Sequence, residues 1–204
     1  MIKDRTSLLL ISETLDWLWY TKIFTKIDLK DAYYRLQVRE GDKWKIAFWT
    51  WYSHFEYCVF PFGLSNTPAI FQVYLNYVLV GLVDIVYVVY LDDLLVFSEN
   101  SEEHKDVVQQ VLERLRTHKL YMNLKKYEFG TDMVEFLGLI VNPTGIIMDP
   151  ACVEAIWDWA TPKTFKEIQM FLGFTNFYRR FIKNYSKVVT PLTDLLSELD
   201  QKKN

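Results

Sequence analysis

The first half of the chain has mainly the hydrophobic pattern of β-strands. Six segments either alternate apolar and polar residues or run apolar throughout, and they are 23–29, 34–39, 44–50, 55–60, 85–90 and 94–97. A Glu-Gly-Asp sequence at 40–42 predicts a turn between the second and third of these strands. Helical spacing of apolar residues predicts helices over 7–20 and 68–80, the second of which begins at Pro68, a residue suited to the first turn of a helix.

From residue 101 the pattern becomes mainly helical. Residues 101–118 predict a helix with Ser101 as its cap and two glutamates in its first turn. A strand is expected over 134–141, and a turn at 143–145 leads into a short strand over 146–148.

The character of the chain changes again at Asp149, where an Asp-Pro pair predicts the start of a helix. Pro162 predicts the start of another helix, Gly173 interrupts it, and helical spacing continues to about residue 196. We therefore place a domain boundary between 1–148 and 149–204.

Composition and charge narrow the class of protein. The chain has 204 residues with a formal net charge of −3; half of it is hydrophobic, and it contains 7 Trp, 13 Tyr and 14 Phe. These values exclude wholesale disorder and a strongly basic nucleic-acid-binding protein. The charge is uneven, because residues 161–189 carry six basic side chains and one acidic one, a net charge of +5. We therefore expect surfaces that face anions in the C-terminal half.

Other common kinds of site are not indicated. Cys58 and Cys152 are too few for a disulfide framework or a metal set, and the three histidines lack zinc-ligand spacing. The uncharged stretch 57–83 is interrupted by prolines and side-chain amides, so it is not predicted to span a membrane. With no targeting segment recognised, we expect a reduced intracellular protein.

Candidate chemistry centres on Asp92 and Asp93, which lie between two apolar runs. Adjacent carboxylates flanked by buried strands repel each other and lose solvation, and a divalent cation relieves both costs. A solvated Asp-Asp turn is the alternative, because such turns are common.

Asp28 is a further acidic residue inside an apolar strand. Two strands of one sheet would bring it beside Asp92 and Asp93, and three carboxylates around two Mg²⁺ ions suit phosphoryl or nucleotidyl transfer. A strand-end residue facing water is the alternative for Asp28. The following Asp31-Ala32-Tyr33 predicts a tight turn whose backbone N–H groups suit phosphate, although Tyr33 also fits a place in the core.

Six motifs in the chain resemble those of the reverse transcriptases of gypsy-type long-terminal-repeat retrotransposons. They include FTKIDLKDAY, YLDDLLVFS and FLGFTNFYRRFI, and the six occupy 24–33, 60–72, 90–98, 123–126, 135–138 and 171–182. They occur in the order typical of that family and cover nearly the whole chain, so their combination is much more specific than any single motif.

The resemblance implies an α+β fold. Residues 1–148 would form partial fingers and a right-hand polymerase palm, with a ferredoxin-like antiparallel sheet and helices, and 149–204 would form an α-helical thumb. The implied activity is RNA-directed DNA polymerase, in which a primer 3′-hydroxyl attacks a dNTP on an RNA or DNA template. The implied partners are a primer–template nucleic acid and dNTPs. No membrane is expected as a partner, and dimerisation is left open. Ribonuclease H and integrase regions are expected in a full-length polyprotein, located in the nucleus or in cytoplasmic virus-like particles.

The resemblance also assigns roles to single positions in the palm. Asp28, Asp92 and Asp93 would be the catalytic carboxylates that hold two Mg²⁺ ions, with Mn²⁺ as a substitute. Lys126 matches the lysine that protonates the pyrophosphate leaving group. The implied nucleotide-binding residues are Asp31, Ala32, Tyr33, Phe62, Gly63 and Gln72. The backbone of Asp31 and Ala32 would bind the triphosphate, and Tyr33 would lie under the sugar. Gln72 would lie in the helix behind the pocket.

Two further sets of residues would contact nucleic acid. The implied primer grip is Phe136, Leu137 and Gly138. The residues implied to contact the nucleic-acid backbone are Lys163, Lys166, Arg179, Arg180 and Lys183. Contacts of this kind supply most sequence-independent affinity.

Several positions depart from the family pattern. Trp49 and Trp51 stand where relatives often have arginine or another polar residue, and Ser53 stands where a turn glycine is usual. Residues 6–10 read TSLLL where relatives read Tyr-Pro-Leu-Pro-Leu. Single transition mutations account for the Arg→Trp, Gly→Ser, Pro→Ser and Pro→Leu changes among these, so we hypothesise a decaying genomic copy. Transversions as frequent as transitions in the coding DNA would contradict this hypothesis. The family's basic fingers strand lies upstream of this sequence, so an active core and a copy inactivated by truncation both stay open.

Two other functions remain as alternatives. A non-catalytic nucleic-acid-binding remnant of a retrotransposon polyprotein would keep the thumb and primer grip without turnover. Another two-metal palm enzyme, such as a nucleotide cyclase, is disfavoured because the chain has no Gly-Gly-acidic turn and has the thumb motif.

Overall fold

The computed structural model describes residues 18, 21–82 and 87–201, so the helix expected over 7–20 lies outside the described residues apart from Leu18. Contacts divide the chain into two compact units. The first comprises residues up to 136 together with 141–146, and the second comprises 137–140 and 147–204. The assignment of fingers, palm and thumb to residue ranges stays a prediction.

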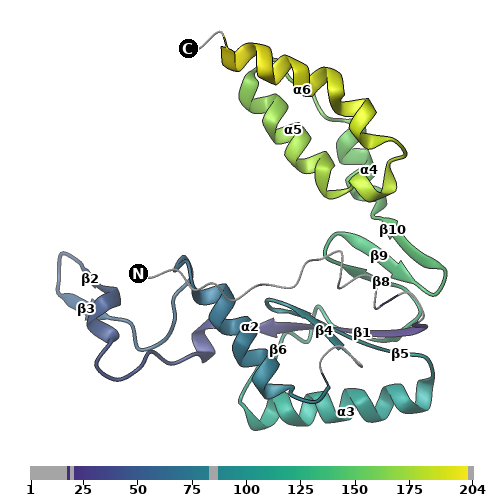
Figure 1. Cartoon of the computed structure of the whole chain (residues 1–204). Coiled ribbons are helices and arrows are strands. Elements are labelled where there is room, and N and C mark those ends of the chain that lie inside the picture. Colours follow the sequence, from purple (N-terminus) through teal and green to yellow (C-terminus); the bar gives the residue numbers. More distant parts are fainter. Residues whose placement is uncertain (1–17, 19–20, 83–86, 202–204) are drawn as a thin grey trace. The chain divides into compact units, whose positions relative to one another are not determined.

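The first unit is built on an antiparallel sheet (Figure 1). Its strands are β1 (Ile23–Lys30), β4 (Tyr87–Tyr90), β5 (Asp93–Ser98), β6 (Tyr121–Met122) and β7 (Glu128–Thr131). The strand order is β4-β5-β1-β6, and β7 also pairs with β1. The strands expected over 23–29 and 94–97 are therefore confirmed, and the family's α+β fold is present.

Two helices pack on this sheet, α2 (Thr67–Val78) and α3 (Ser101–Thr117). Side chains such as Ile27 on β1, Leu94 on β5, Phe71 on α2 and Val111 on α3 are fully buried in one shared core. Removing this apolar surface from water is the main force that holds the helices on the sheet. The buried ring of His104 on α3 is also hydrogen-bonded to two hydroxyls of the sheet.

Two sequence predictions in this unit are wrong. Residues 34–39 do not form a strand, because the chain turns through a 3₁₀-helix, η1 (Tyr33–Arg35), before it extends again. The cap of α3 is Asn100 rather than Ser101, since the extended Asn100 accepts a hydrogen bond from the N–H of Glu103 and donates one to its carboxylate.

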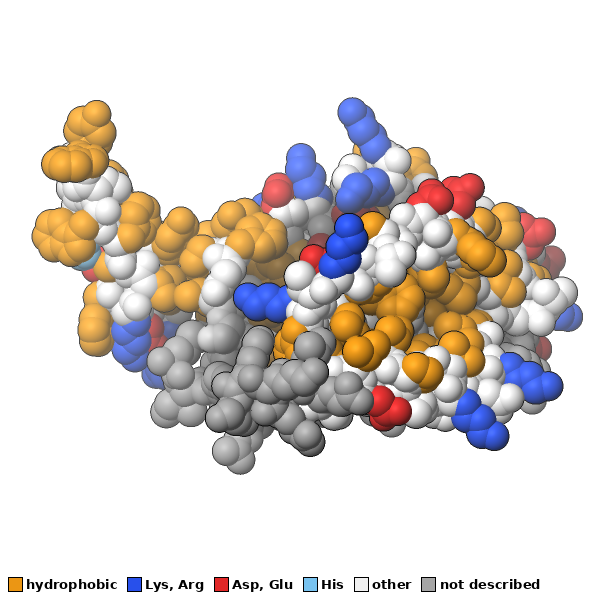
Figure 2. Space-filling view, turned by 90° about the horizontal axis from the view of Figure 1, so that it is seen from above, with side chains coloured by type: hydrophobic (Ala, Val, Ile, Leu, Met, Phe, Trp, Pro, Cys, Tyr) orange, Lys and Arg blue, Asp and Glu red, His pale blue; other side chains and the backbone are white. Residues whose placement is uncertain are grey.

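A short 3₁₀-helix, η2 (Lys43–Ile46), is followed by a hairpin of β2 (Ala47–Trp49) and β3 (His54–Glu56). Both strands are shorter than those expected at 44–50 and 55–60, because η2 takes up the start of the first and the second ends at residue 56. Figure 2 shows this projecting hairpin on the left with mostly hydrophobic side chains. Trp49 and Trp51 are 81% and 101% exposed. A polar side chain would therefore meet no obstacle at either position, and the hypothesis of decay by transition mutations stays a prediction.

A three-stranded sheet, β8 (Val134–Phe136), β9 (Leu139–Asn142) and β10 (Gly145–Met148), contains residues of both units. The single strand expected over 134–141 is wrong, because Leu137 and Gly138 both have positive φ and end β8 in a tight turn.

The rest of the second unit is helical. Its elements are α4 (Pro150–Trp157), α5 (Phe165–Phe177), η3 (Arg179–Phe181) and α6 (Tyr185–Gln201). Asp149 caps α4 as expected, but α5 begins after its cap Thr164 rather than at Pro162, and Gly173 lies inside it without interrupting it. Among the described residues, none of these helices or those of the first unit has the length and apolar character that crossing a membrane requires.

Candidate functional site

Three carboxylates meet at one end of the central sheet. Asp28 near the end of β1 is directly opposite Asp93 at the start of β5 in the antiparallel register. The carbonyl of Asp92 accepts a hydrogen bond from the N–H of Leu29 at 3.0 Å, which ties the turn to β1. Asp92 is exposed, and the other two carboxylates are half-buried. The sheet thus brings together the three residues that the sequence analysis singled out.

The turn between β4 and β5 is held from behind by a glutamine. Leu91 has a φ of 59°, a left-handed conformation that non-glycine residues seldom adopt. Gln72, a buried residue of α2, accepts a hydrogen bond from the N–H of Leu91 at 3.2 Å and donates one to the carbonyl of Val89 at 3.3 Å. Its amide therefore fixes the backbone that carries the two aspartates.

A lysine lies against these carboxylates. The Nζ atom of Lys126 is 2.8 Å from Oδ2 of Asp28. Its pKa is raised, first by this hydrogen bond and the charge of Asp28, then by the charges of Asp93 and Asp92. Burial raises the pKa of Asp93; Lys26 opposes this shift, and the charges of Asp92 and Asp28 add to it.

The residues present suit a cation, although no group of three or more His, Cys, Asp or Glu side chains in the described part of the chain is already arranged to hold a metal ion. The ammonium group of Lys126 occupies the place that a metal ion would take, because it is paired with Asp28. The charges of all three carboxylates favour its protonated form. Carboxylate oxygens are also the ligands that Mg²⁺ prefers.

A cavity of about 450 Å³ lies next to this carboxylate turn. Its lining residues are Tyr33, Phe62, Gly63, Leu64, Ser65, Thr67, Pro68 and Asp92. The ring of Tyr33 is held edge-on between two phenylalanines, with its centroid 5.0 Å from that of Phe62 and 5.3 Å from that of Phe71. Burial, and then the charge of Asp92, raises the pKa of Tyr33. Three of the predicted nucleotide-binding residues therefore share a cavity with a predicted catalytic carboxylate.

The other predicted nucleotide-binding residues have different surroundings. Asp31 has a φ of 54° and Ala32 a φ of −51°, and this change of hand is typical of backbone nests that bind anions. Gln72 does not line the cavity and is engaged with the β4–β5 hairpin instead. Sequence reasoning missed Leu64, Ser65, Thr67 and Pro68; the Thr-Pro pair at the start of α2 was the signal that could have found the last two.

The predicted primer grip and basic residues are placed as follows. Phe136 is fully buried, while Leu137 and Gly138 form the left-handed turn after β8. The five basic residues predicted to contact nucleic-acid backbone are all exposed, and they are Lys163, Lys166, Arg179, Arg180 and Lys183. They lie in the second unit around α5 and η3.

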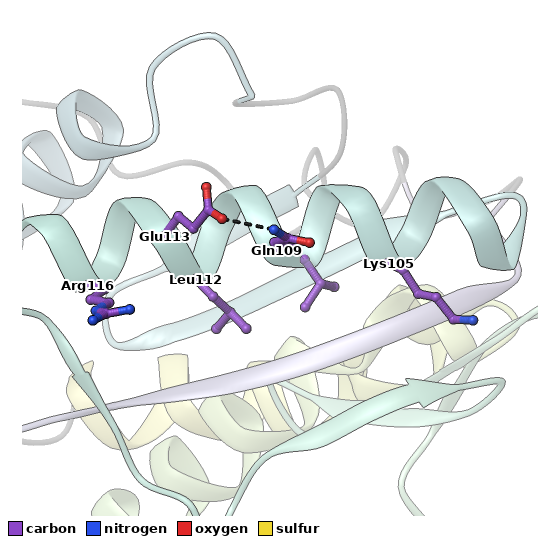
Figure 3. Close-up of a pocket in the computed structure, with 6 residues that line it drawn as sticks. Lys105, Gln109, Leu112, Glu113 and Arg116 are labelled. Atoms are coloured by element: carbon purple, nitrogen blue, oxygen red, sulfur yellow. Dashed lines mark hydrogen bonds between the residues drawn. The ribbon is translucent and has the colours of Figure 1, made fainter.

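A second cavity, of about 370 Å³, lies on the side of α3 (Figure 3). Lys105, Leu112 and Arg116 are among its lining residues, and Gln109 donates a hydrogen bond to Glu113 beside them. No residue predicted from the sequence to act in catalysis lines it, so it is not the candidate site.

The antiparallel sheet with its packed helices is a fold of the polymerase palm type. Residues 2–141 match the family model described as reverse transcriptase (RNA-dependent DNA polymerase). The chain belongs to this family.

Its relatives include polyproteins of retrotransposons. The chain is 42% identical over 185 residues to the retrovirus-related Pol polyprotein from transposon opus of Drosophila melanogaster. The aligned region covers 91% of this chain and 18% of that protein. It is 37% identical over 189 residues to the transposon Tf2-3 polyprotein of Schizosaccharomyces pombe, covering 93% and 14%. The chain thus spans less than a fifth of the length of these relatives.

Solved structures agree with the family assignment. A foamy viral protease-reverse transcriptase in complex with double-stranded DNA is 27% identical, with a TM-score of 0.88 over 96% of this chain and 34% of that chain. The foamy viral enzyme in complex with an RNA/DNA hybrid is also 27% identical, with a TM-score of 0.79 over 89% of this chain and 25% of that chain.

Proposed function

We propose that this chain is the polymerase core of a reverse transcriptase that transfers a nucleotide from a dNTP to a primer 3′-hydroxyl. The observation that carries the proposal is the register of β1 and β5, which puts Asp28 opposite Asp93. The neighbour of Asp93 in the chain, Asp92, lines the 450 Å³ cavity. Two Mg²⁺ ions bound there would lower the pKa of the primer hydroxyl and neutralise the charge that develops on the phosphates.

The chain's own residues would then act as follows. Asp28, Asp92 and Asp93 would hold the cations, and Lys126 would give up its ion pair with Asp28 when a cation is bound there. The primer 3′-hydroxyl loses its proton to solvent, and its oxygen bonds to the α-phosphorus of the dNTP while the bond from that phosphorus to the bridging oxygen breaks. Pyrophosphate leaves and accepts a proton from Nζ of Lys126. Tyr33 lies beneath the sugar of the incoming nucleotide.

The proposed partners are a primer–template duplex and dNTPs. Support comes from the foamy viral structures, which contain double-stranded DNA or an RNA/DNA hybrid, and from the exposed basic residues around α5 and η3. Because the relatives are polyproteins, we also propose ribonuclease H and integrase regions elsewhere in the same gene product.

A primer-extension assay with Mg²⁺ tests the proposal. Asp92→Asn should lower the rate of incorporation at least about 1,000-fold, because the substitution removes a charged ligand at the reacting phosphate. Asp106→Asn, an exposed residue on α3, is the matched control and should leave the rate unchanged.

Incorporation that survives Asp92→Asn would overturn the site assignment. A wild-type chain that binds primer–template but incorporates nothing would instead favour the non-catalytic remnant, a function that the exposed basic residues also support.

A further inference from the structure

The hydroxyl of Thr67 is unpaired at the start of α2. Thr67 is only 2% exposed, and its Oγ1 atom is the buried side-chain oxygen for which the described residues provide no hydrogen-bond partner. Its backbone N–H is already engaged, donating to the carbonyl of Leu64 at 3.2 Å. Buried polar groups in folded proteins are nearly always hydrogen-bonded, so an unpaired hydroxyl at this depth needs an explanation.

The surroundings of Thr67 point to a ligand. Thr67 lines the same cavity as Asp92 and Tyr33. It is also the first residue of a 12-residue helix, where the backbone carries a partial positive charge. Pro68, the second residue of this helix, has no backbone N–H to donate. A hydroxyl donor at the positive end of a helix suits an anionic oxygen.

We propose that the Thr67 hydroxyl donates a hydrogen bond to a phosphate oxygen of the nucleotide ligand in this cavity. The inference rests on the proposed function and adds a binding residue to its site. The phosphate belongs either to an incoming dNTP or to the backbone of a nucleic-acid strand, since both carry the same chemistry. Because Asp92 lies on the same cavity and repels a bare anion, binding through Thr67 depends on a divalent cation.

The first test is the stability of the ligand-free protein. Thr67→Val keeps the shape of the side chain and removes the unpaired hydroxyl, so its melting temperature should equal that of the wild type or exceed it by about 2–4 °C. Thr67→Ser keeps the hydroxyl and is the matched control for binding. A lower melting temperature for Thr67→Val would mean that the hydroxyl has a structural partner, and it would overturn the proposal.

The second test is binding without turnover. Dissociation constants are measured with Mg²⁺ for a dNTP without primer, and separately for a primer–template duplex without dNTP. Thr67→Val should weaken one of the two about tenfold, which identifies the source of the phosphate, and Thr67→Ser should bind like the wild type. Wild-type affinity of Thr67→Val in both arms would overturn the proposal.

These measurements separate the inference from the function on which it rests. A protein that incorporates no nucleotide in the primer-extension assay but loses affinity in Thr67→Val keeps the phosphate site and rejects the polymerase activity. If the wild-type protein incorporates nucleotides and Thr67→Val binds both ligands with unchanged affinity, the polymerase activity is kept and the phosphate contact of Thr67 is rejected.

Discussion

Two turns of this chain, each in a hairpin with a predicted function, hold a leucine in the left-handed region. Leu91 has a φ of 59° between β4 and β5, before the aspartates predicted to be catalytic, and Leu137 has a φ of 54° between β8 and β9, in the predicted primer grip. This conformation costs about 1–2 kcal/mol in a residue with a side chain. Strain of this kind persists only where the surroundings determine the backbone.

The two turns are secured by different means. The amide of Gln72 holds the β4–β5 turn through two hydrogen bonds with its backbone. At the β8–β9 turn, Gly138 has a φ of 73°, and a Cβ atom added there would lie 3.3 Å from the hydroxyl oxygen of Tyr178. That hydroxyl donates a hydrogen bond to Sγ of Cys152 at 3.0 Å. A buried amide thus anchors the first turn, whereas at the second turn a tyrosine hydroxyl lies close to a glycine.

The largest effect is expected from removing the polar anchor. Gln72→Leu leaves the N–H of Leu91 and the buried carbonyl of Val89 without their partner, so the free energy of unfolding should fall by about 3 kcal/mol. Urea denaturation measures this loss. Amide hydrogen exchange at Leu91 should become faster, because the backbone of the turn opens more often.

The control for this substitution is Gln110→Leu on the exposed face of α3, which should change stability by less than about 0.5 kcal/mol. An unchanged exchange rate at Leu91 in Gln72→Leu would mean that the strand pairing alone holds the turn. The contrast between the two turns would then disappear.

A smaller effect is expected at the second turn. Gly138→Ala should lower the free energy of unfolding by about 2 kcal/mol, because alanine resists positive φ and its Cβ would crowd the Tyr178 hydroxyl. In a Tyr178→Phe background the crowding is absent, so the same substitution should cost only about 1 kcal/mol. A double-mutant cycle measures the difference.

Equal costs of Gly138→Ala in the two backgrounds would show that the backbone angle alone makes glycine necessary. The close approach of Tyr178 would then play no part in fixing the turn.

The sequence predicts which acidic residues come together at the first turn, but it does not predict the contacts that hold the backbone of that turn. Asp28 and Asp92 stood out because carboxylates are rare in apolar strands, and the family's motifs gave their roles. Nothing in the sequence marked Leu91 as left-handed, since leucine seldom adopts that conformation, and the part played by Gln72 depends on a contact between α2 and β4.

Elsewhere the apolar pattern left local geometry undecided. Residues 34–39 alternate as a strand does, yet the buried Tyr33 packs against two phenylalanines and the chain there forms the 3₁₀-helix η1. The mostly apolar residues 134–141 gave no sign of the turn at Leu137 and Gly138, because a two-residue turn made of such residues does not interrupt the hydrophobic pattern. The unpaired hydroxyl of Thr67 could be found only from the structure.

The smallest effect concerns charge, which only the first of the two turns carries. Burial raises the pKa of Asp93 above its ordinary value of 3.8. The folded state therefore binds a proton more tightly than the unfolded state, and this contribution to stability is complete below about pH 4 and is lost as the pH rises through the raised pKa. Asp93→Asn cannot ionise, so its melting temperature relative to the wild type should rise between about pH 4 and pH 7 in EDTA. The exposed Asp132→Asn should have no such trend, and a pH-independent difference for Asp93→Asn would mean that the folded protein solvates this carboxylate as well as water does.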